Sequence, residues 1–308
     1  MATPNASDWA LLPTADCPLV TPAMKTLYHV AHNDESLLGL CLFRGQMATD
    51  LEEAHADSGF PVDKTVKVLR DDSNRIVTKL LLSLPRNLTL SLLRHTLARD
   101  IRQRIEGLHT YPSDYKGVYA AAISVKGRGG RFLSVDEIKQ LVSTIQDYRT
   151  GVRLWLDNGK KWNRNDATHQ RSEAVVKSVD FQLLRLSKIP ENNDKPRFGQ
   201  GQKGLVRLNQ LCYMLERFVT AAATHGFDTT VPLCQSPLMI GCSYVSMKTR
   251  CKAHWREYGG GFGATTWTWE FALCAMASLG FDPDVVTIPI LVTTDRPSYP
   301  RRRCWSRH

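Results

Sequence analysis

The sequence has no hydrophobic run long enough to cross a lipid bilayer. Its most apolar stretches, at positions 80–84 and 285–292, are far shorter than the roughly 20 residues that a membrane helix needs. Positions 1–10 contain no lysine or arginine, and no apolar segment of signal-peptide length follows before Asp16. The sequence therefore predicts an intracellular protein, cytoplasmic or nuclear, that is neither secreted nor embedded in a membrane.

The sequence also lacks the cysteine patterns that mark disulfide-stapled domains and structural metal sites. Its eight cysteines are spread over 308 residues, without the density of small secreted domains. The candidate zinc ligands are Cys234, Cys242, Cys251 and His254. Their spacing contains no Cys-x-x-Cys pair of the kind that structural zinc sites use. Reduced, buried thiols are therefore the favoured interpretation, and no metal ligand is assigned.

The composition is not that of a disordered chain, which would have a low hydrophobic content and a very high charge. Hydrophobic residues make up 43% and charged residues 23% of the chain, as in ordinary globular proteins. This length favours about two folded units. The turn-forming segment 190–204 is the predicted linker between an N-terminal region, 1–189, and a C-terminal module, 205–308. Positions 1–72 show no clean period, and we expect them to be largely irregular.

The hydrophobic periodicity predicts a mixed α/β (α+β) fold, with a helix-rich N-terminal part and a small C-terminal sheet flanked by helices. Ser134 and Glu137 have the spacing of a capping box, at the start of a helix expected to end at Gly151. The other helices are expected at 88–108, 205–225, 246–258 and 267–279, and the strands at 117–125, 181–186, 237–245 and 284–292.

A glycine-rich basic turn at 126–131 separates the strand at 117–125 from the capped helix. Free amides and arginines in such a turn suit a phosphate, although the turn matches neither the dinucleotide-binding nor the P-loop pattern. An ordinary exposed turn is the alternative, and the sequence leaves both open.

The net charge of +10 is unevenly distributed along the chain. Positions 1–57 contain two basic and eight acidic residues, whereas positions 149–207 contain 13 basic and six acidic residues. Trp155 and Trp162 lie within the basic segment, which is therefore the predicted nucleic-acid surface. The expected contacts are Arg153, Lys160, Lys161 and Arg164. A solvated basic face whose tryptophans belong to the core is the alternative.

Positions 239–241, Met-Ile-Gly, end a predicted strand and lead into a basic helix that carries Arg250. This segment, about 237–270, resembles the second half of the motif that defines GIY-YIG nucleases. In that family an aromatic–apolar–glycine strand end is followed by an arginine that helps to bind the scissile phosphate. The resemblance implies this role for Arg250, although methionine stands where the family has tyrosine. Lys252 and His254, on the same helix, are predicted nucleic-acid contacts.

Positions 117–119, Gly-Val-Tyr, come close to the first half of the same motif, which implies a catalytic role for Tyr119. A large insertion must separate the two halves. A phosphodiester transition state needs cationic stabilisation and usually a divalent metal, such as Mg²⁺, held by a carboxylate. Glu270 is the candidate carboxylate, and a solvated helix position is its alternative. Positions 202–293 as a whole also resemble a group of filamentous-fungal proteins, which implies no function.

Positions 301–308 are rich in arginine, in abrupt contrast to the strand expected before them. They are either a basic tail that contacts phosphate or the product of a reading-frame shift. A GIY-YIG module has a carboxylate-bearing helix in about this place, so a shifted frame would leave it without its metal ligand. We therefore expect this chain to be catalytically inactive, and the removal of 301–308 to change thermal stability little.

These features together predict a nucleic-acid-associated protein with a divergent GIY-YIG-like nuclease module, whether or not that module is active. If it is an enzyme, it is a metal-dependent phosphodiesterase. The alternative is a non-enzymatic accessory protein whose basic surface meets an acidic protein partner, its own acidic N-terminal part included. Binding to nucleic acid would weaken steeply as salt rises, because counterions are released.

Overall fold

The computed structural model describes residues 11–22, 24, 25, 28, 49, 52, 86–104, 116–187, 195–243, 246–252, 254 and 267–293. Its elements, in chain order, are α6 (Arg86–Leu93), α7 (Leu97–Arg102), β1 (Lys116–Val125), α8 (Val135–Asp157), α9 (Ala167–Ser187), α10 (Gln202–His225), β2 (Leu238–Ser243), α11 (Met247–Lys252), α12 (Trp267–Ser278) and β3 (Pro283–Thr293). The predicted mixed α/β fold is confirmed. The tail at 301–308 and most of 1–72 lie outside the described residues.

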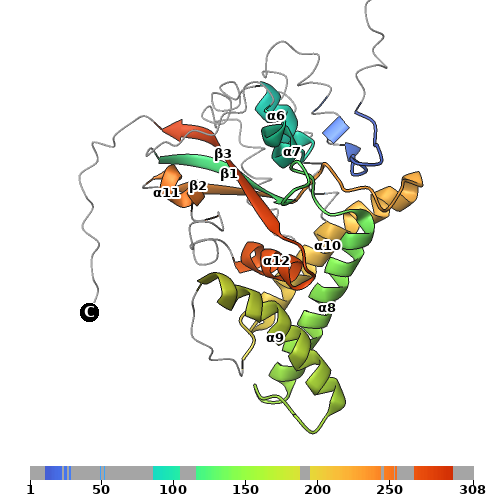
Figure 1. Ribbon diagram of the computed structural model, residues 1–308, viewed down its shortest axis with the longest axis vertical. Coiled ribbons are helices and arrows are strands. Elements are labelled where there is room, and N and C mark those ends of the chain that lie inside the picture. The colour runs from blue at the N-terminus through green and yellow to red at the C-terminus, as the bar shows by residue number, and fades with distance from the viewer. Residues whose placement is uncertain are drawn as a thin grey trace, which may run out of the picture.

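The three strands form one antiparallel sheet in the order β2-β1-β3, with β1 in the centre (Figure 1). After Lys116, β1 reads Gly-Val-Tyr-Ala-Ala-Ala-Ile-Ser-Val, an uncharged run that can be covered on both faces. β1 precedes the predicted linker at 190–204, whereas β2 and β3 follow it. The sheet therefore takes its central strand from the predicted N-terminal region and its two edges from the C-terminal one.

Helices cover both faces of this sheet (Figure 1). Ala121, Ile123 and Val125 of β1 belong to the larger core cluster, together with buried residues of α8, α9, α10 and α12. Ala120 and Ala122 point the opposite way and pack in a smaller cluster with α6 and α7. Because the larger cluster contains residues from both sides of the linker, the two predicted regions share a core.

The capping box at the start of α8 is confirmed. The Ser134 hydroxyl accepts a bond from the Glu137 amide at 3.3 Å, and the Glu137 carboxylate accepts one from the Ser134 amide at 2.8 Å. The predicted end at Gly151 is wrong, because the helix continues to Asp157. A Cβ atom at Gly151 would lie 2.8 Å from Val176 of α9, so this glycine allows close helix packing rather than ending the helix.

The strand predicted at 181–186 is also wrong, because these residues belong to α9. Val176, Val179 and Asp180 are buried at spacings of three and four residues, which gives α9 a helical face toward the core. Phe181, the first residue of the predicted strand, is 50% exposed. A segment of six residues is too short to distinguish the alternating period of a strand from the period of a helix.

The single helix predicted at 88–108 is divided into α6 and α7. His95, between them, has a φ of 58°, and the Thr96 amide bonds back to the Ser91 carbonyl at 3.0 Å. Farther along the chain the predictions agree with the structure. Gly226 ends α10 in the left-handed conformation, and β2, α12 and β3 lie within a few residues of their expected places.

The helix predicted at 246–258 is described only in its first part, as α11. Of the positions beyond Lys252 in this segment, His254 alone is described, in a turn. None of the helices in the described ranges combines the length and the hydrophobicity that crossing a bilayer requires.

Candidate functional site

Tyr119 lies directly across the sheet from Gly241. The two are partners where β1 pairs antiparallel with β2, so the Gly-Val-Tyr and Met-Ile-Gly segments lie on neighbouring strands. A Cβ atom at position 241 would lie 2.4 Å from both the Cζ atom and the hydroxyl oxygen of Tyr119, far inside van der Waals contact. Glycine at 241 therefore leaves the space that the tyrosine ring occupies.

The Tyr119 hydroxyl meets His254, which follows α11. The hydroxyl oxygen lies 2.7 Å from the Nε2 atom of His254, and both side chains are 1% exposed. The His254 amide bonds to the Cys251 carbonyl at 3.0 Å, which fixes the turn after the helix. Met247, at the helix start, is buried and contacts β1 at Gly117. α11 thus docks on β1 at one end and carries the histidine to the tyrosine at the other.

Burial keeps both groups of this pair neutral at neutral pH. Burial raises the pKa of Tyr119, and a hydrogen bond and the charge of Arg250 oppose that rise without cancelling it. Burial and, to a smaller degree, the Arg250 charge lower the pKa of His254 to about 4. The Tyr119 hydroxyl accepts from Arg250, which can only donate, so the hydroxyl has its own proton to donate to Nε2 of His254 in the tautomer protonated at Nδ1. The Nδ1 atom then carries the other proton, and it has no partner among the described residues.

The structure brings together three of the predicted site residues: Tyr119, Arg250 and His254. Lys252 lies on the same helix, and its side chain is not described. The sequence signal was the strand, turn and basic helix in this order. Arg250, half-buried, is the only one of the three that is both charged and partly open to solvent.

Glu270 lies on α12 and, among the described residues, makes no hydrogen bond or ion pair with Tyr119, Arg250 or His254. Burial raises the pKa of Glu270 to about 7. Burial and, to a smaller degree, the charge of Glu270 raise the pKa of Cys274 one helical turn later. Within the described ranges, no group of three or more His, Cys, Asp or Glu side chains is placed to hold a metal.

The arginines of the glycine-rich turn at 126–131 form ion pairs within the protein. Arg128 pairs with Glu137 at 2.6 Å, and Arg131 pairs with Asp16 at 3.0 Å. Gly127, Gly129 and Gly130 all have positive φ, which closes the turn tightly before α8. Since Glu137 also caps α8, the arrangement favours the ordinary turn over a phosphate cradle.

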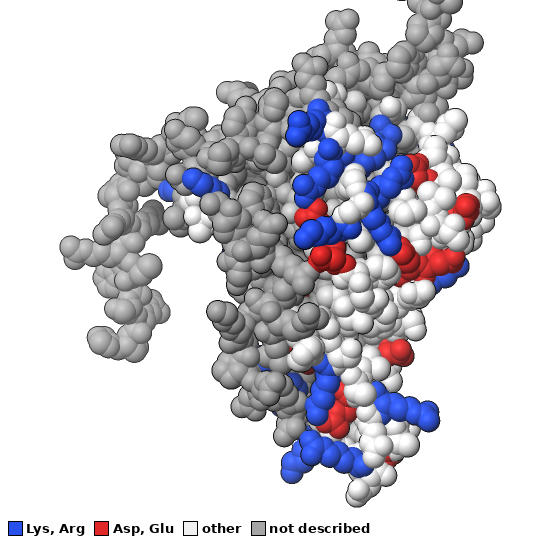
Figure 2. All heavy atoms as spheres, viewed as in Figure 1, with Lys and Arg blue, Asp and Glu red and all other residues white. Residues whose placement is uncertain are grey.

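The hairpin of α8 and α9 ends in an exposed basic surface, at the lower end of the molecule in Figure 2. Arg153, Lys160, Lys161 and Arg164 are all exposed there. Arg164 contacts Glu173 at 3.7 Å. Trp155 is buried and Trp162 packs on the core, so the tryptophans belong to the interior, as the alternative interpretation expected. Since the tryptophans are not part of this surface, the four exposed cations are its features that suit a phosphate backbone.

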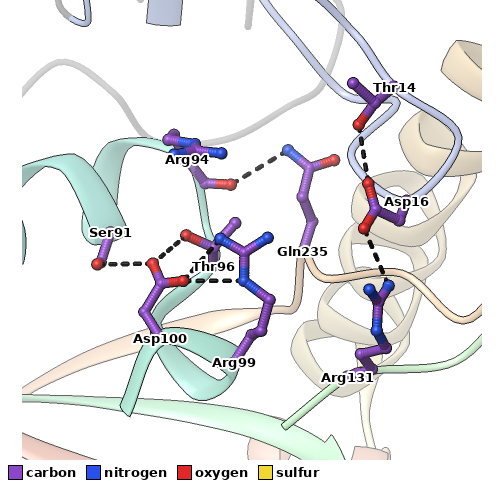
Figure 3. A network of polar contacts seen from close by, with 9 residues as sticks. All are labelled: Thr14, Asp16, Ser91, Arg94, Thr96, Arg99, Asp100, Arg131 and Gln235. Atoms are coloured by element: carbon purple, nitrogen blue, oxygen red, sulfur yellow. Dashed lines mark hydrogen bonds and ion pairs between the residues drawn. The ribbon is translucent and has the colours of Figure 1, made fainter. Parts of the chain in front are cut away.

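A polar cluster that no sequence pattern indicated surrounds Asp100 (Figure 3). Asp100 is 3% exposed and accepts hydrogen bonds from the hydroxyls of Ser91, at 2.7 Å, and Thr96. The Arg99 guanidinium donates two more, at 2.9 and 2.7 Å. This cluster fixes the break between α6 and α7. Polar side chains at these spacings are common on exposed helices, so they carried no distinctive signal.

Gln235 joins the N-terminal segment to this cluster (Figure 3). Its side-chain amide accepts from the Leu19 amide at 2.9 Å and donates to the Leu19 carbonyl at 2.8 Å and the Arg94 carbonyl at 3.2 Å. Burial raises the pKa of Asp16, but hydrogen bonds from Thr14 and Arg131 outweigh it, with a net lowering. One carboxylate of the N-terminal segment therefore pairs with one arginine of the folded core.

Comparisons of the chain with protein-family models, with curated proteins and with solved structures find no match.

Proposed function

We propose that the protein is nucleic-acid-associated and that β1, β2 and α11 form a divergent GIY-YIG-like nuclease module. The observation that carries the proposal is the pairing of Tyr119 with Gly241 across the sheet, with Arg250 and His254 beside the tyrosine hydroxyl. The two motif halves are far apart in the sequence, so chance similarity of either half gives no reason for them to be adjacent. Their adjacency supports a common origin for both halves.

The proposed roles follow from the chemistry of the three side chains. Arg250 binds a non-bridging phosphate oxygen, since its guanidinium is permanently charged and partly open to solvent. In a cleavage step the attacking water would form the new P–O bond and give its proton to the Tyr119 hydroxyl, which passes its own proton to the neutral Nε2 atom of His254, 2.7 Å away. The P–O bond to the leaving sugar oxygen breaks at the same time, and that oxygen takes up a proton from solvent. Metal-assisted cleavage needs a carboxylate here, and Glu270 does not act on this site. We therefore assign phosphate binding with weak or no cleavage, and route no step through Mg²⁺.

Arg250→Ala is expected to weaken binding of a short DNA or RNA duplex about tenfold or more, because a charge-assisted hydrogen bond to phosphate is lost. The helix should stay intact, since alanine suits a helix, and the melting temperature should fall only by the small loss of the hydrogen bond between Arg250 and Tyr119. Fluorescence anisotropy at low salt measures the affinity. Lys248→Ala removes the same charge from the same helix and is expected to cost much less.

Equal losses for the two variants would show that α11 contributes charge only, and would contradict a phosphate site at Arg250. If the wild-type protein cleaves the duplex, Arg250→Ala should abolish cleavage. A folded wild-type sample that shows no binding at micromolar protein would contradict nucleic-acid association as a whole.

The exposed end of α8 and α9 is the second surface assigned to the nucleic-acid backbone. The double variant Lys160→Ala, Lys161→Ala is expected to lower the slope of log affinity against log salt by up to about 2, one for each phosphate that a lysine no longer neutralises. The matched control is the double variant Lys126→Ala, Lys139→Ala, which removes the same charge. Lys126 lies in the turn before α8 and Lys139 near the start of that helix, and both are exposed. An unchanged slope for the first pair would contradict this surface.

The contact between Asp16 and Arg131 favours a second candidate function, a non-enzymatic accessory protein that binds an acidic protein partner. Here one carboxylate of the N-terminal segment, that of Asp16, already pairs with an arginine of the core, Arg131, at 3.0 Å. The salt-slope measurement separates the two candidates when it is repeated with an acidic peptide. Tighter binding of the peptide than of the duplex at equal salt would favour the accessory role.

A further inference from the structure

Two cysteines that are far apart in the sequence, Cys17 and Cys234, are adjacent in the fold. The two thiols are close enough for each to act on the pKa of the other, and both residues are buried, at 5% and 1% exposure. The backbone holds them there, because the Cys234 amide donates to the Asp16 carbonyl at 2.7 Å. The two bonds between Leu19 and Gln235 continue this pairing.

The backbone bond also limits the separation of the two Cα atoms. Standard peptide geometry places the Cα atom of residue 17 about 2.8 Å from the carbonyl oxygen of residue 16, and the Cα atom of residue 234 about 1.5 Å from its own amide nitrogen. Added to the hydrogen bond, these lengths allow the Cα atoms of Cys17 and Cys234 to be at most about 7 Å apart. Disulfides span distances near and below this limit.

The surroundings divide the two thiols into different chemical roles. The hydrogen bond from Cys17 lowers the pKa of Cys234, burial raises it, and the charges of Arg99 and Arg131 lower it further, with a net lowering. The same hydrogen bond and burial raise the pKa of Cys17. The negative charge of Asp16 acts against both thiolates. Two arginine charges, those of Arg99 and Arg131, favour the thiolate of Cys234, whereas one, that of Arg94, favours the thiolate of Cys17. We therefore take Cys234 as the nucleophile and Cys17 as the thiol that resolves it.

We propose that Cys17 and Cys234 form a redox-active thiol pair that a peroxide converts to a disulfide, which ties residues 11–20 to the loop before β2. The Cys234 thiolate attacks the O–O bond of hydrogen peroxide, which gives a sulfenic acid and hydroxide, and the hydroxide takes up a proton to become water. The Cys17 sulfur then attacks the sulfenic sulfur, loses its proton, and expels a second water as the S–S bond forms. Two thiols and one peroxide give one disulfide and two waters.

The disulfide would act on the N-terminal segment at residues 11–20. Without it, residues 11–20 are held by non-covalent bonds, among them Asp16 to Arg131 and Leu19 to Gln235. Because short segments held in this way open locally more easily than the core, peroxide reaches Cys234 when this segment opens, and the disulfide forms when the segment closes again. Oxidation then keeps the segment closed on Arg131. This inference does not depend on the nuclease-like site.

The test treats the full-length protein with hydrogen peroxide under native conditions, and maps the non-reduced digest by mass spectrometry. The expected product is a Cys17–Cys234 peptide pair with a loss of about 2 Da, and a melting temperature raised by about 5 °C or more relative to the reduced protein. The exposed Cys242 reports that the oxidant was active. In Cys17→Ser, Cys234 should stop at a sulfenic acid that dimedone traps, whereas the buried-cysteine control Cys212→Ser should form the pair normally.

Oxidation of Cys242 without any Cys17–Cys234 peptide in the wild-type protein would overturn the proposal. This measurement needs no variant, so it holds even where a substitution impairs folding. A cross-linked peptide with an unchanged melting temperature would overturn the claim that the bond secures the N-terminal segment.

Discussion

Asp100→Ala should lower the free energy of unfolding by about 3–5 kcal/mol, the range found when one partner of a buried ion pair is removed. The carboxylate is 3% exposed and satisfies two buried hydroxyls, on Ser91 and Thr96, as well as the Arg99 guanidinium. Alanine would leave the two buried hydroxyls without their acceptor and the Arg99 guanidinium, whose side chain is 17% exposed, without its partner. Since these bonds also fix the break between α6 and α7, the loss should extend to the packing of α7 on the sheet.

Chemical denaturation measures this loss, and two further variants locate it. Asp100→Asn keeps the size and one acceptor oxygen, so it should fall between wild type and alanine. Asp147→Ala removes an exposed carboxylate from α8 and should stay within about 0.5 kcal/mol of wild type. A loss below about 1 kcal/mol for Asp100→Ala would mean that water reaches the cluster, and would contradict its burial.

Gly130→Ala is expected to cost at least about 3 kcal/mol, because two penalties coincide at this position. Gly130 has a φ of 84°, which side-chain-bearing residues rarely adopt. A Cβ atom there would also lie 2.4 Å from the carbonyl oxygen of Ala98, and the atoms in the way belong to backbone rather than to a flexible side chain. The turn and α7 would therefore have to separate.

Gly127→Ala is the matched control in the same turn. Its φ of 82° is nearly the same, but nothing lies within 4 Å of the added Cβ atom, so only the conformational penalty of about 1 kcal/mol remains. The difference between the two variants in thermal or urea unfolding measures the close approach alone. Equal losses would show that the turn and α7 are not in contact in solution.

The elements that could be predicted from sequence were those whose signals are local. The capping box at Ser134, the glycine that ends α10 at Gly226, and the uncharged strand at 117–125 each depend on neighbours within a few residues. The predictions were wrong where one local signal is compatible with two structures. Gly151 allows helices to approach as well as ending them, and the short apolar pattern after Phe181 fits either period.

The order of the strands could not be derived in the same way, because pairing joins residues more than a hundred positions apart. In the candidate site, too, the sequence indicates individual residues but not which of them are close in space. The motif patterns singled out Tyr119, Arg250 and His254, but only the fold shows that they meet. The Cys17–Cys234 pair was missed, since Cys234 was grouped with Cys242, Cys251 and His254, which are near it in the sequence, and Cys17 lies more than two hundred positions away.

The central position of β1 has a consequence for synthesis on the ribosome. β1 emerges early, yet its bonds go to residues far downstream: the Ser124 hydroxyl bonds to Asp284, 160 positions later. Helices α8, α9 and α10 emerge in between and can form from local contacts while β1 is still unpaired. Until β2 has left the exit tunnel both edges of β1 are open, and one edge stays open until β3 follows. After Lys116, β1 is an uncharged run without proline, which is the composition of an aggregation-prone segment. The nascent chain should therefore depend on chaperones, or on slow elongation, during the interval between α10 and β3.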